Sequence, residues 1–365
     1  MRCLRNRSKT GFAAVIFLVS AVTGVFGACG GSQPPGASPE TMPEAGPKRG
    51  PKRMPLLITE SDHVGLKNLG NTCYANATFQ MLAGSPRFMN RLENVINGPA
   101  EGLRRSLGKF LTQFWERQLA FERSTPMRSE VGFASAIREV FKQFNALGTG
   151  FQVTMTQQED AEEFLTSLLG AFDLSLDIRV GARVVFNNGE ARDLPFSDES
   201  ILRLAVNDAT VNSVATALNF FHRLTLRSWP NQLQNNAGVL ADSTVSGRLL
   251  EPAGGVPEEV FVQLLRFRQI NPQRREKDSK VIEAFSPILL NFARANGAVE
   301  QRQYRPMTYI VHRGETIESG HYVAYKVDNS GGWRLYNDQI VSIVSAQTAI
   351  NDIQANAYLI LYRRL

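Results

Sequence analysis

The chain has 365 residues, 43% of them hydrophobic, and a formal net charge of +6. That positive excess is confined to the N-terminal part, because 32 basic and 32 acidic residues remain from residue 56 onward. A net positive charge can indicate nucleic-acid binding, but the chain has no basic stripe interleaved with aromatic residues, which argues against that function. Three cysteines, Cys3, Cys29 and Cys73, are too few for a disulfide framework or a four-cysteine zinc site.

The first 28 residues have the layout of an export signal. Four basic residues and no acid precede an apolar run, GFAAVIFLVSAVTGVFG, that ends beside Cys29. The small residues directly before Cys29 resemble the lipobox of bacterial lipoproteins, although Phe26 occupies a position where leucine is usual. We therefore expect cleavage before Cys29, lipidation of that cysteine and attachment to a membrane. An ordinary signal peptide and a chance apolar start are the alternatives.

Residues 29–55 have the composition of a disordered tether. They contain seven prolines and five glycines with almost no large apolar residue, so this segment cannot bury a core. Residues 56–365 are sufficient for one large domain or two coupled subdomains.

The folded part has helical patterns first and strand patterns afterwards. The clearest helical pattern is 157–172, in which six apolar residues share one face: Ala161, Phe164, Leu165, Leu168, Leu169 and Phe172. Segments rich in valine and aromatic residues follow from about residue 182, and they predict strands at 180–186, 259–267, 304–312, 321–327, 333–341 and 357–362. Helices followed by strands predict an α+β fold.

Cys73 lies where a glycine-containing loop runs into a helical pattern, in GLKNLGNTCYANATFQML (residues 65–82). Asn71 and Thr72 are typical helix caps, and apolar residues at helical spacing follow Cys73. The unpaired amides and the dipole at a helix N-terminus favour a thiolate, which makes Cys73 a candidate nucleophile. A buried and inert cysteine is the alternative.

A second polar group lies near the C-terminus. The strands 321–327 and 333–341 flank DNSGG, a turn signal, and predict an antiparallel hairpin with His321 and Asn337 roughly opposite each other. A cysteine, a histidine that takes its proton and an amide that orients the imidazole form the triad of papain-like enzymes. Alone, His321 could be structural and Asn337-Asp338 a simple turn. With Cys73 they predict a cysteine-type enzyme that needs no cofactor.

Five segments resemble the sequence boxes of the ubiquitin-specific proteases and occur in the family's order. Residues 65–82 resemble the cysteine box, and HRGETIESGHYVAY with WRLYNDQIVSIV behind it resembles the histidine box. QEDAEEFL, VPEEVFVQLLRF and AYLILYRR are similar to the intermediate motif, an Arg-Phe strand and the closing strand of the family. Five boxes in order are a specific signal. The resemblance spans residues 65–363 and implies a papain-like fold with a helical thumb (65–180) and an antiparallel palm with fingers (181–365).

The resemblance assigns roles to five residues of the expected site. It implies that Cys73 is the nucleophile, His321 the general base and Asn337 the residue that orients the imidazole. Asp338 matches a family position that assists catalysis, and Asn68 matches the side-chain donor to the oxyanion.

The resemblance also implies a site for the C-terminal tail of ubiquitin. Asp160 and Glu163 would bind the basic residues of that tail, with a solvated helix edge as the alternative for the two acids. Gly320, which has no side chain, would let the diglycine end pass close to His321, and Tyr322 would belong to the same site.

Two departures from the family pattern concern packing and metal binding. Ala75 and Ala77 occupy positions where Met and Ser are usual, on the helix after the nucleophile. The region 223–251 has no cysteine, whereas many members carry two Cys-x-x-Cys pairs that hold a zinc ribbon. We therefore expect a reduced, zinc-free fingers region and no metal site.

These features predict a thiol-dependent deubiquitinase whose partners are ubiquitin and ubiquitinated proteins, with no nucleic-acid partner. Because ubiquitin is a eukaryotic cytosolic protein, the export signal indicates a bacterial protein, lipid-anchored or secreted, that acts on ubiquitin in a host cytosol. A protease for another ubiquitin-like modifier and a catalytically inactive ubiquitin-binding surface lipoprotein are the alternatives.

Overall fold

The computed structural model of the chain describes residues 64–96, 102–120, 130–147, 151–171, 178–223, 225–228, 232–271, 274–317, 319–327 and 331–365. The signal-like segment, Cys29, the predicted tether and Phe172 lie outside the described residues. No helix among those described is both long and apolar enough to cross a membrane.

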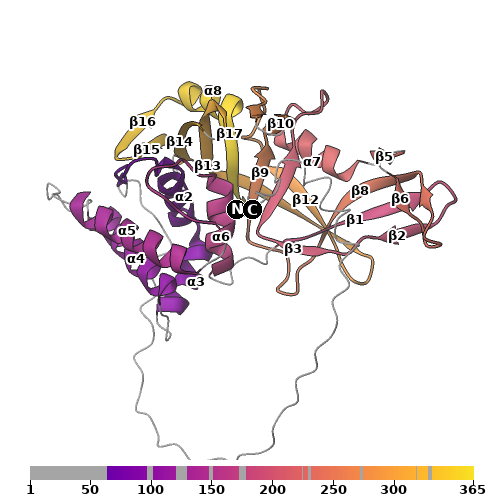
Figure 1. Ribbon diagram of the computed structural model, residues 1–365, viewed down its shortest axis with the longest axis horizontal. Helices are drawn as coiled ribbons and strands as arrows, with labels where there is room; N and C mark the ends of the chain where they lie inside the picture. Colours follow the sequence, from indigo (N-terminus) through magenta and orange to yellow (C-terminus); the bar gives the residue numbers. More distant parts are fainter. Residues whose placement is uncertain are drawn as a thin grey trace, which may run out of the picture.

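Most helices of the described chain precede its strands, and only α7 and α8 follow among them, which fits the α+β class. Of the described helices, five come before the first described strand and form a helical lobe (Figure 1). Their bounds are α2 Cys73–Ala83, α3 Pro86–Ile96, α4 Leu103–Ala120, α5 Glu130–Ala146 and α6 Ala161–Ala171. Helix α6 confirms the predicted helix, and five of its six expected apolar residues are buried: Ala161, Phe164, Leu165, Leu168 and Leu169.

Helix α2 lies between the large sheet and the other helices of the helical lobe, and every one of its residues is buried. The sequence indicated an apolar stripe on one face, but polar residues of α2 are buried as well. Their side chains find backbone partners: the Thr78 hydroxyl donates to the Tyr74 carbonyl and the Gln80 amide to the Val64 carbonyl, each at 2.8 Å. A helix enclosed on all sides holds its N-terminus in a fixed place.

A 13-stranded mixed sheet forms the rest of the core. Its main path runs β16-β15-β14-β13-β12-β8-β1-β2, while β17 pairs with β13 and β9, and β9 pairs with β4. The strands of this sheet are β1 Ile178–Phe186, β2 Ala191–Asp193, β3 Ser197–Glu199, β4 Ile201–Ala205, β5 Thr225–Arg227, β8 Ser243–Leu250, β9 Glu259–Leu265, β12 Ile288–Ala293, β13 Val299–Thr316, β14 Ser319–Val327, β15 Trp333–Asn337, β16 Ile340–Val344 and β17 Ala357–Arg364. Two separate two-stranded sheets consist of β6 Leu233–Gln234 with β7 Leu240–Ala241, and of β10 Phe267–Asn271 with β11 Arg274–Lys277. Helix α7 (Val214–His222) packs against β4 and β8, and α8 (Ala346–Asn356) against β13 and β17.

The fingers are the far end of this sheet, where β1, β2 and β8 extend away from the helical lobe (Figure 1). They have a small hydrophobic core of their own: Ala182, Val184, Phe186, Leu194, Leu233 and Val245. In the part of the chain that the structure describes, no three His, Cys, Asp or Glu side chains are grouped to hold a metal ion. The six apolar side chains pack on one another, and backbone pairing joins β1 to β2 and to β8.

The predicted hairpin is present as β14 and β15, with Ala324 paired to Tyr336. Continuing this register places Asn337 opposite Val323, two residues from His321 and on the same face of the strand. His321 and Asn337 are therefore diagonal neighbours, close enough for their side chains to meet.

The predicted strand 333–341 is wrong in one respect, because it is interrupted at the hairpin between β15 and β16. Asn337 pairs with Ile340, so Asp338 and Gln339 form a two-residue turn. Asp338 has φ of 50°, a left-handed conformation that aspartate tolerates better than most residues. The turn brings the Asp338 side chain to the end of the strand that carries Asn337.

Candidate active site

Cys73 is the first residue of α2 and is 3% exposed. The loop before it is fixed to the helical lobe, since the Asn71 backbone N–H donates to the Met155 carbonyl at 2.9 Å. Thr72 occupies the N-cap position without a side-chain capping bond; its hydroxyl instead accepts from the Leu69 backbone N–H at 2.9 Å. The loop thus presents the thiol at the start of the helix, as the sequence predicted.

His321 links the thiol to Asn337. Its Nε2 lies 2.6 Å from Asn337 Oδ1. Because an amide oxygen can only accept, Nε2 carries the proton in this assignment, and Nδ1 is left to take the proton of Cys73. The hydrogen bond to Cys73, supported by the Asn337 bond, raises the pKa of His321 to about 9. The structure therefore brings together the three residues that the sequence predicted as a triad.

Asp338 lies beside this triad and is held by two asparagines. Its Oδ2 is 3.8 Å from His321 Nε2 and accepts from the Asn68 amide at 3.0 Å. Its Oδ1 accepts from Asn76, a residue that sequence analysis did not single out. The negative charge of Asp338 is one of the contributions that raise the pKa of His321, after the hydrogen bonds to Cys73 and Asn337.

Asn68, the predicted oxyanion donor, is oriented by contacts at both ends of its amide. Its Oδ1 accepts from the backbone N–H groups of Gly70 and Thr72, each at 3.1 Å, and its Nδ2 donates to Asp338. The amide nitrogen carries two hydrogens, so the bond to Asp338 uses one of them. Donation to an oxyanion stays a prediction.

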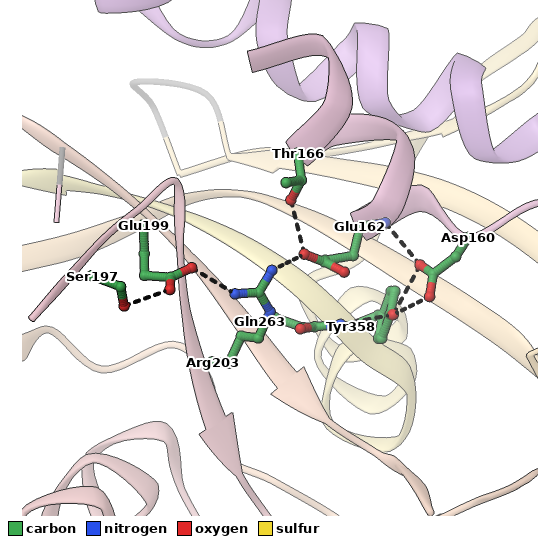
Figure 2. Close-up of polar contacts among 8 residues, drawn as sticks. All are labelled: Asp160, Glu162, Thr166, Ser197, Glu199, Arg203, Gln263 and Tyr358. Carbon is green, nitrogen blue, oxygen red and sulfur yellow. Dashed lines mark hydrogen bonds and ion pairs between the residues drawn. The ribbon is translucent and has the colours of Figure 1, made fainter. Parts of the chain in front are cut away.

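Asp160 directly precedes α6, and its carboxylate is bonded inside the protein (Figure 2). Its Oδ1 accepts from the Glu162 backbone N–H at 2.8 Å, and the Tyr358 hydroxyl donates to both oxygens at 2.8 and 2.9 Å. Burial, together with the negative charge of Glu162, raises the pKa of Asp160 to about 7. Asp160 thus joins α6 to β17, and binding of a ubiquitin tail by Asp160 and Glu163 stays a prediction.

Glu162 makes an ion pair that sequence analysis missed. Its Oε1 lies 2.5 Å from Arg203 Nη2 on β4, and the other end of that guanidinium lies 3.0 Å from Glu199 (Figure 2). Nothing in the local pattern marks Glu162 as more important than its acidic neighbours, because its partner is 41 residues away.

Gly320 and Tyr322 flank His321 on β14, where the glycine is exposed and Tyr322 is buried. A Cβ on Gly320 would lie 2.4 Å from the Arg313 carbonyl and 2.7 Å from the His312 ring, and its φ is 147°. Tyr322 is 1% exposed, and its ring lies 4.6 Å from that of His312. Internal packing therefore accounts for the glycine, and the predicted contacts of both residues with a ubiquitin tail stay predictions.

His312, which sequence analysis also missed, lies fully buried on β13. Burial and the positive charge of Lys277 lower its pKa to about 4, so the ring is neutral at physiological pH. Its Nε2 is 3.3 Å from the Gln158 amide, and this contact connects β13, which pairs with the strand that carries His321, to the segment before α6. The only sequence signal was its position in the histidine box.

Known proteins that are similar in sequence to this chain include ubiquitin carboxyl-terminal hydrolases of a plant and a yeast. Ubiquitin carboxyl-terminal hydrolase 25 of Arabidopsis thaliana is 25% identical over 344 residues, which cover 85% of this chain and 49% of the relative. Ubiquitin carboxyl-terminal hydrolase 8 of Saccharomyces cerevisiae is 22% identical over 82% of this chain and 70% of its own length. The chain thus spans about half the length of the Arabidopsis relative.

The fold is shared with a solved structure of the SAGA Ubp8/Sgf11/Sus1/Sgf73 DUB module bound to ubiquitin aldehyde. The TM-score is 0.66 at 16% sequence identity, and the match covers 84% of this chain and 70% of that one. The papain-like α+β fold expected from the sequence is therefore confirmed. The family model described as "Ubiquitin carboxyl-terminal hydrolase" matches residues 64–362. Its match takes in four of the five sequence boxes, the closing strand as far as Tyr362, and Cys73, His321, Asn337 and Asp338, and the chain belongs to the ubiquitin carboxyl-terminal hydrolase family.

Proposed function

We propose that the chain is a thiol-dependent isopeptidase that removes ubiquitin from lysine side chains. The observation that carries the proposal is the placement of Cys73 at the start of α2, where it raises the pKa of a histidine, His321, that Asn337 orients through a 2.6 Å contact. Membership of the family supports ubiquitin as the modifier.

In the proposed reaction, His321 takes the Cys73 proton and the sulfur attacks the carbonyl carbon of the terminal glycine. Backbone amides at the start of α2 and the Asn68 side chain stabilise the oxyanion. The imidazolium then gives its proton to the leaving lysine amine, which breaks the isopeptide bond and leaves a thioester. His321 next takes a proton from water, whose oxygen displaces the sulfur and releases ubiquitin with a free carboxylate.

Asp160 and Glu163 bind the basic residues of the ubiquitin tail in this proposal, and the tail's glycines pass Gly320 on the way to Cys73. Support comes from Glu163 in the first turn of α6, with Asp160 directly before that helix, and from the exposure of Gly320 next to His321.

The proposal is tested by incubating the full chain with ubiquitin that carries a C-terminal electrophile and weighing the product by mass spectrometry. A single adduct is expected with the native chain and none with Cys73→Ala. Electrophiles on other ubiquitin-like modifiers should react more slowly. A folded native chain that forms no ubiquitin adduct would contradict the proposal. If another modifier labels the chain instead, the protein is a protease for that modifier. If ubiquitin binds without reacting, the protein is an inactive ubiquitin-binding protein.

The location of the activity is a separate proposal. The protein is an exported bacterial lipoprotein, anchored through Cys29 or secreted, that acts on the ubiquitin of a host; the basic and apolar N-terminal pattern supports it. Expression in a bacterium that is fed an alkyne-tagged fatty acid tests it. Labelling of the native chain but not of Cys29→Ser is expected. Export without labelling would indicate an ordinary signal, and retention of the unprocessed chain inside the cell would contradict export.

A further inference from the structure

Asn76 lies on α2, three residues after Cys73, and is 3% exposed. Its amide nitrogen donates to Asp338 Oδ1 at 2.7 Å and to the carbonyls of Leu66 and Lys67 at 3.1 and 3.3 Å. All three partners are acceptors. The orientation of the amide is therefore fixed by its surroundings, because a reversed amide would aim its oxygen at them.

The other end of this amide is unpaired. Among the described residues, Asn76 Oδ1 is buried without a hydrogen-bond partner, which is unfavourable for folding. Packing of α2 alone does not explain an amide in that place. The contact that distinguishes the site is the one to Asp338, which crosses from the helix of the nucleophile to the turn between β15 and β16.

Both carboxylate oxygens of Asp338 accept hydrogen bonds from asparagine side chains. Asn76 holds Oδ1, and Asn68 holds Oδ2 at 3.0 Å, with Oδ2 3.8 Å from His321 Nε2. The Asp338 carbonyl also accepts from the Leu66 backbone N–H at 2.8 Å. The Asp338 carboxylate thus joins the turn between β15 and β16 to the loop before Cys73 and to helix α2.

We propose that Asn76 is a positioning residue for thioester formation and hydrolysis at Cys73. It holds the Asp338 carboxylate so that this charge stays beside His321 and the Asn68 amide stays aimed at the oxyanion. Asn76 touches no reacting atom and acts through Asp338. The inference rests on the proposed function.

The first test is steady-state kinetics of the full chain on a fluorogenic ubiquitin C-terminal substrate. Asn76→Ala should lower kcat roughly 10- to 100-fold, as loss of an outer-shell orienting group commonly does, with KM changed less than about 3-fold. Thr78→Ala is the matched control, because Thr78 is also buried on α2 but bonds the Tyr74 carbonyl of the same helix. The control should lower the melting temperature and leave kcat unchanged.

A double variant tests the route through Asp338. If Asn76 acts through that carboxylate, Asn76→Ala combined with Asp338→Ala should be no slower than Asp338→Ala alone, within about 2-fold. Losses that multiply in the double variant, or an unchanged kcat in Asn76→Ala, would overturn the inference.

A second readout needs no ubiquitin. NMR titration of histidine-labelled full chain, with His321→Gln to assign the signal, should show His321 titrating at lower pH in Asn76→Ala than in the native chain or in Thr78→Ala. If the native chain turns over no ubiquitin substrate but this shift is present, the proposed function fails and the positioning role stands. An unshifted titration overturns the positioning role.

If Asn76→Ala does not fold, Asn76→Asp takes its place in the kinetic test, because aspartate keeps the shape of the asparagine side chain. Its carboxyl faces Asp338, near His321 and Cys73, and can donate one hydrogen bond only while protonated. The kcat of this variant should therefore fall with rising pH relative to that of the native chain. A pH profile parallel to the native one would contradict the inference.

Discussion

At the scale of single residues, the environment of His321 decides the chemistry of the site. Its pKa is raised to about 9, first by the hydrogen bond to Cys73 and then by Asn337 and the charge of Asp338. Each of these interactions favours the imidazolium over the neutral ring. The imidazolium of His321 should therefore persist up to the alkaline side of neutrality, and kcat/KM should decline as pH rises through about 9.

Asn337→Ala tests this account. It removes one hydrogen bond that favours the imidazolium and that orients the ring, so kcat should fall on the order of 100-fold, the lower end of what a positioned acid–base group contributes. The alkaline limb of kcat/KM should also move to lower pH. Stopped assays between pH 6 and about 10 on a fluorogenic ubiquitin substrate measure both effects. An alkaline limb that stays in place would show that Asn337 does not influence the imidazolium.

At the scale of elements, the fingers are stabilised by six side chains in a core separate from the two larger ones. Phe186 is the largest of them and is 2% exposed on β1. Phe186→Ala should destabilise β1, β2 and β8 by about 3 kcal/mol, because it removes a buried ring and leaves a cavity. Hydrogen exchange should become faster in these strands and stay unchanged in α2, which packs in a different core.

The same variant should separate two substrates. If the fingers hold the globular body of ubiquitin, KM for full-length ubiquitin substrate should rise while hydrolysis of a short peptide of the ubiquitin tail stays the same. Leu240→Ala is the control, since Leu240 lies on β7 and is 58% exposed. Faster exchange throughout the protein would show that the fingers do not unfold as a separate unit.

At the scale of the whole molecule, the sequence predicted what lies within contiguous segments. Helix α6, the six predicted strand segments and the separate boxes that carry Cys73 and His321 were accessible because periodicity and sequence boxes are local, whereas strands such as β4, β8 and β12 were not predicted. The contacts of Asp338 with Asn68 and of Asp160 with Tyr358 were not, because they join residues 270 and 198 positions apart. Such contacts depend on how the helical lobe packs on the sheet, and no local pattern specifies that packing.

Asp160 is the clearest case of a residue whose charge is governed by this packing. Burial between α6 and β17, with the charge of Glu162, raises its pKa from 3.8 to about 7. The folded state therefore binds the proton more tightly than the unfolded state does. The resulting contribution to stability is fully present below pH 3.8 and is lost as pH rises through about 7.

Asp160→Asn should remove this loss of stability at high pH. An amide oxygen still accepts a hydrogen bond from the Tyr358 hydroxyl but carries no charge that must be buried. At pH 8 the full chain with Asp160→Asn should be more stable than the native chain by on the order of 2 kcal/mol, and at pH 4 the two should unfold at similar temperatures. Asp198→Asn, at a 43%-exposed side chain on β3 that pairs with Arg179, is the surface control and should not make the protein more stable at pH 8. The Asp160 variant should also raise KM for ubiquitin, since the tail's basic residues lose a carboxylate. Thermal unfolding at both pH values measures the difference in stability between the variant and the native chain. Equal stability at pH 8 would show that the buried charge of Asp160 does not destabilise the folded state.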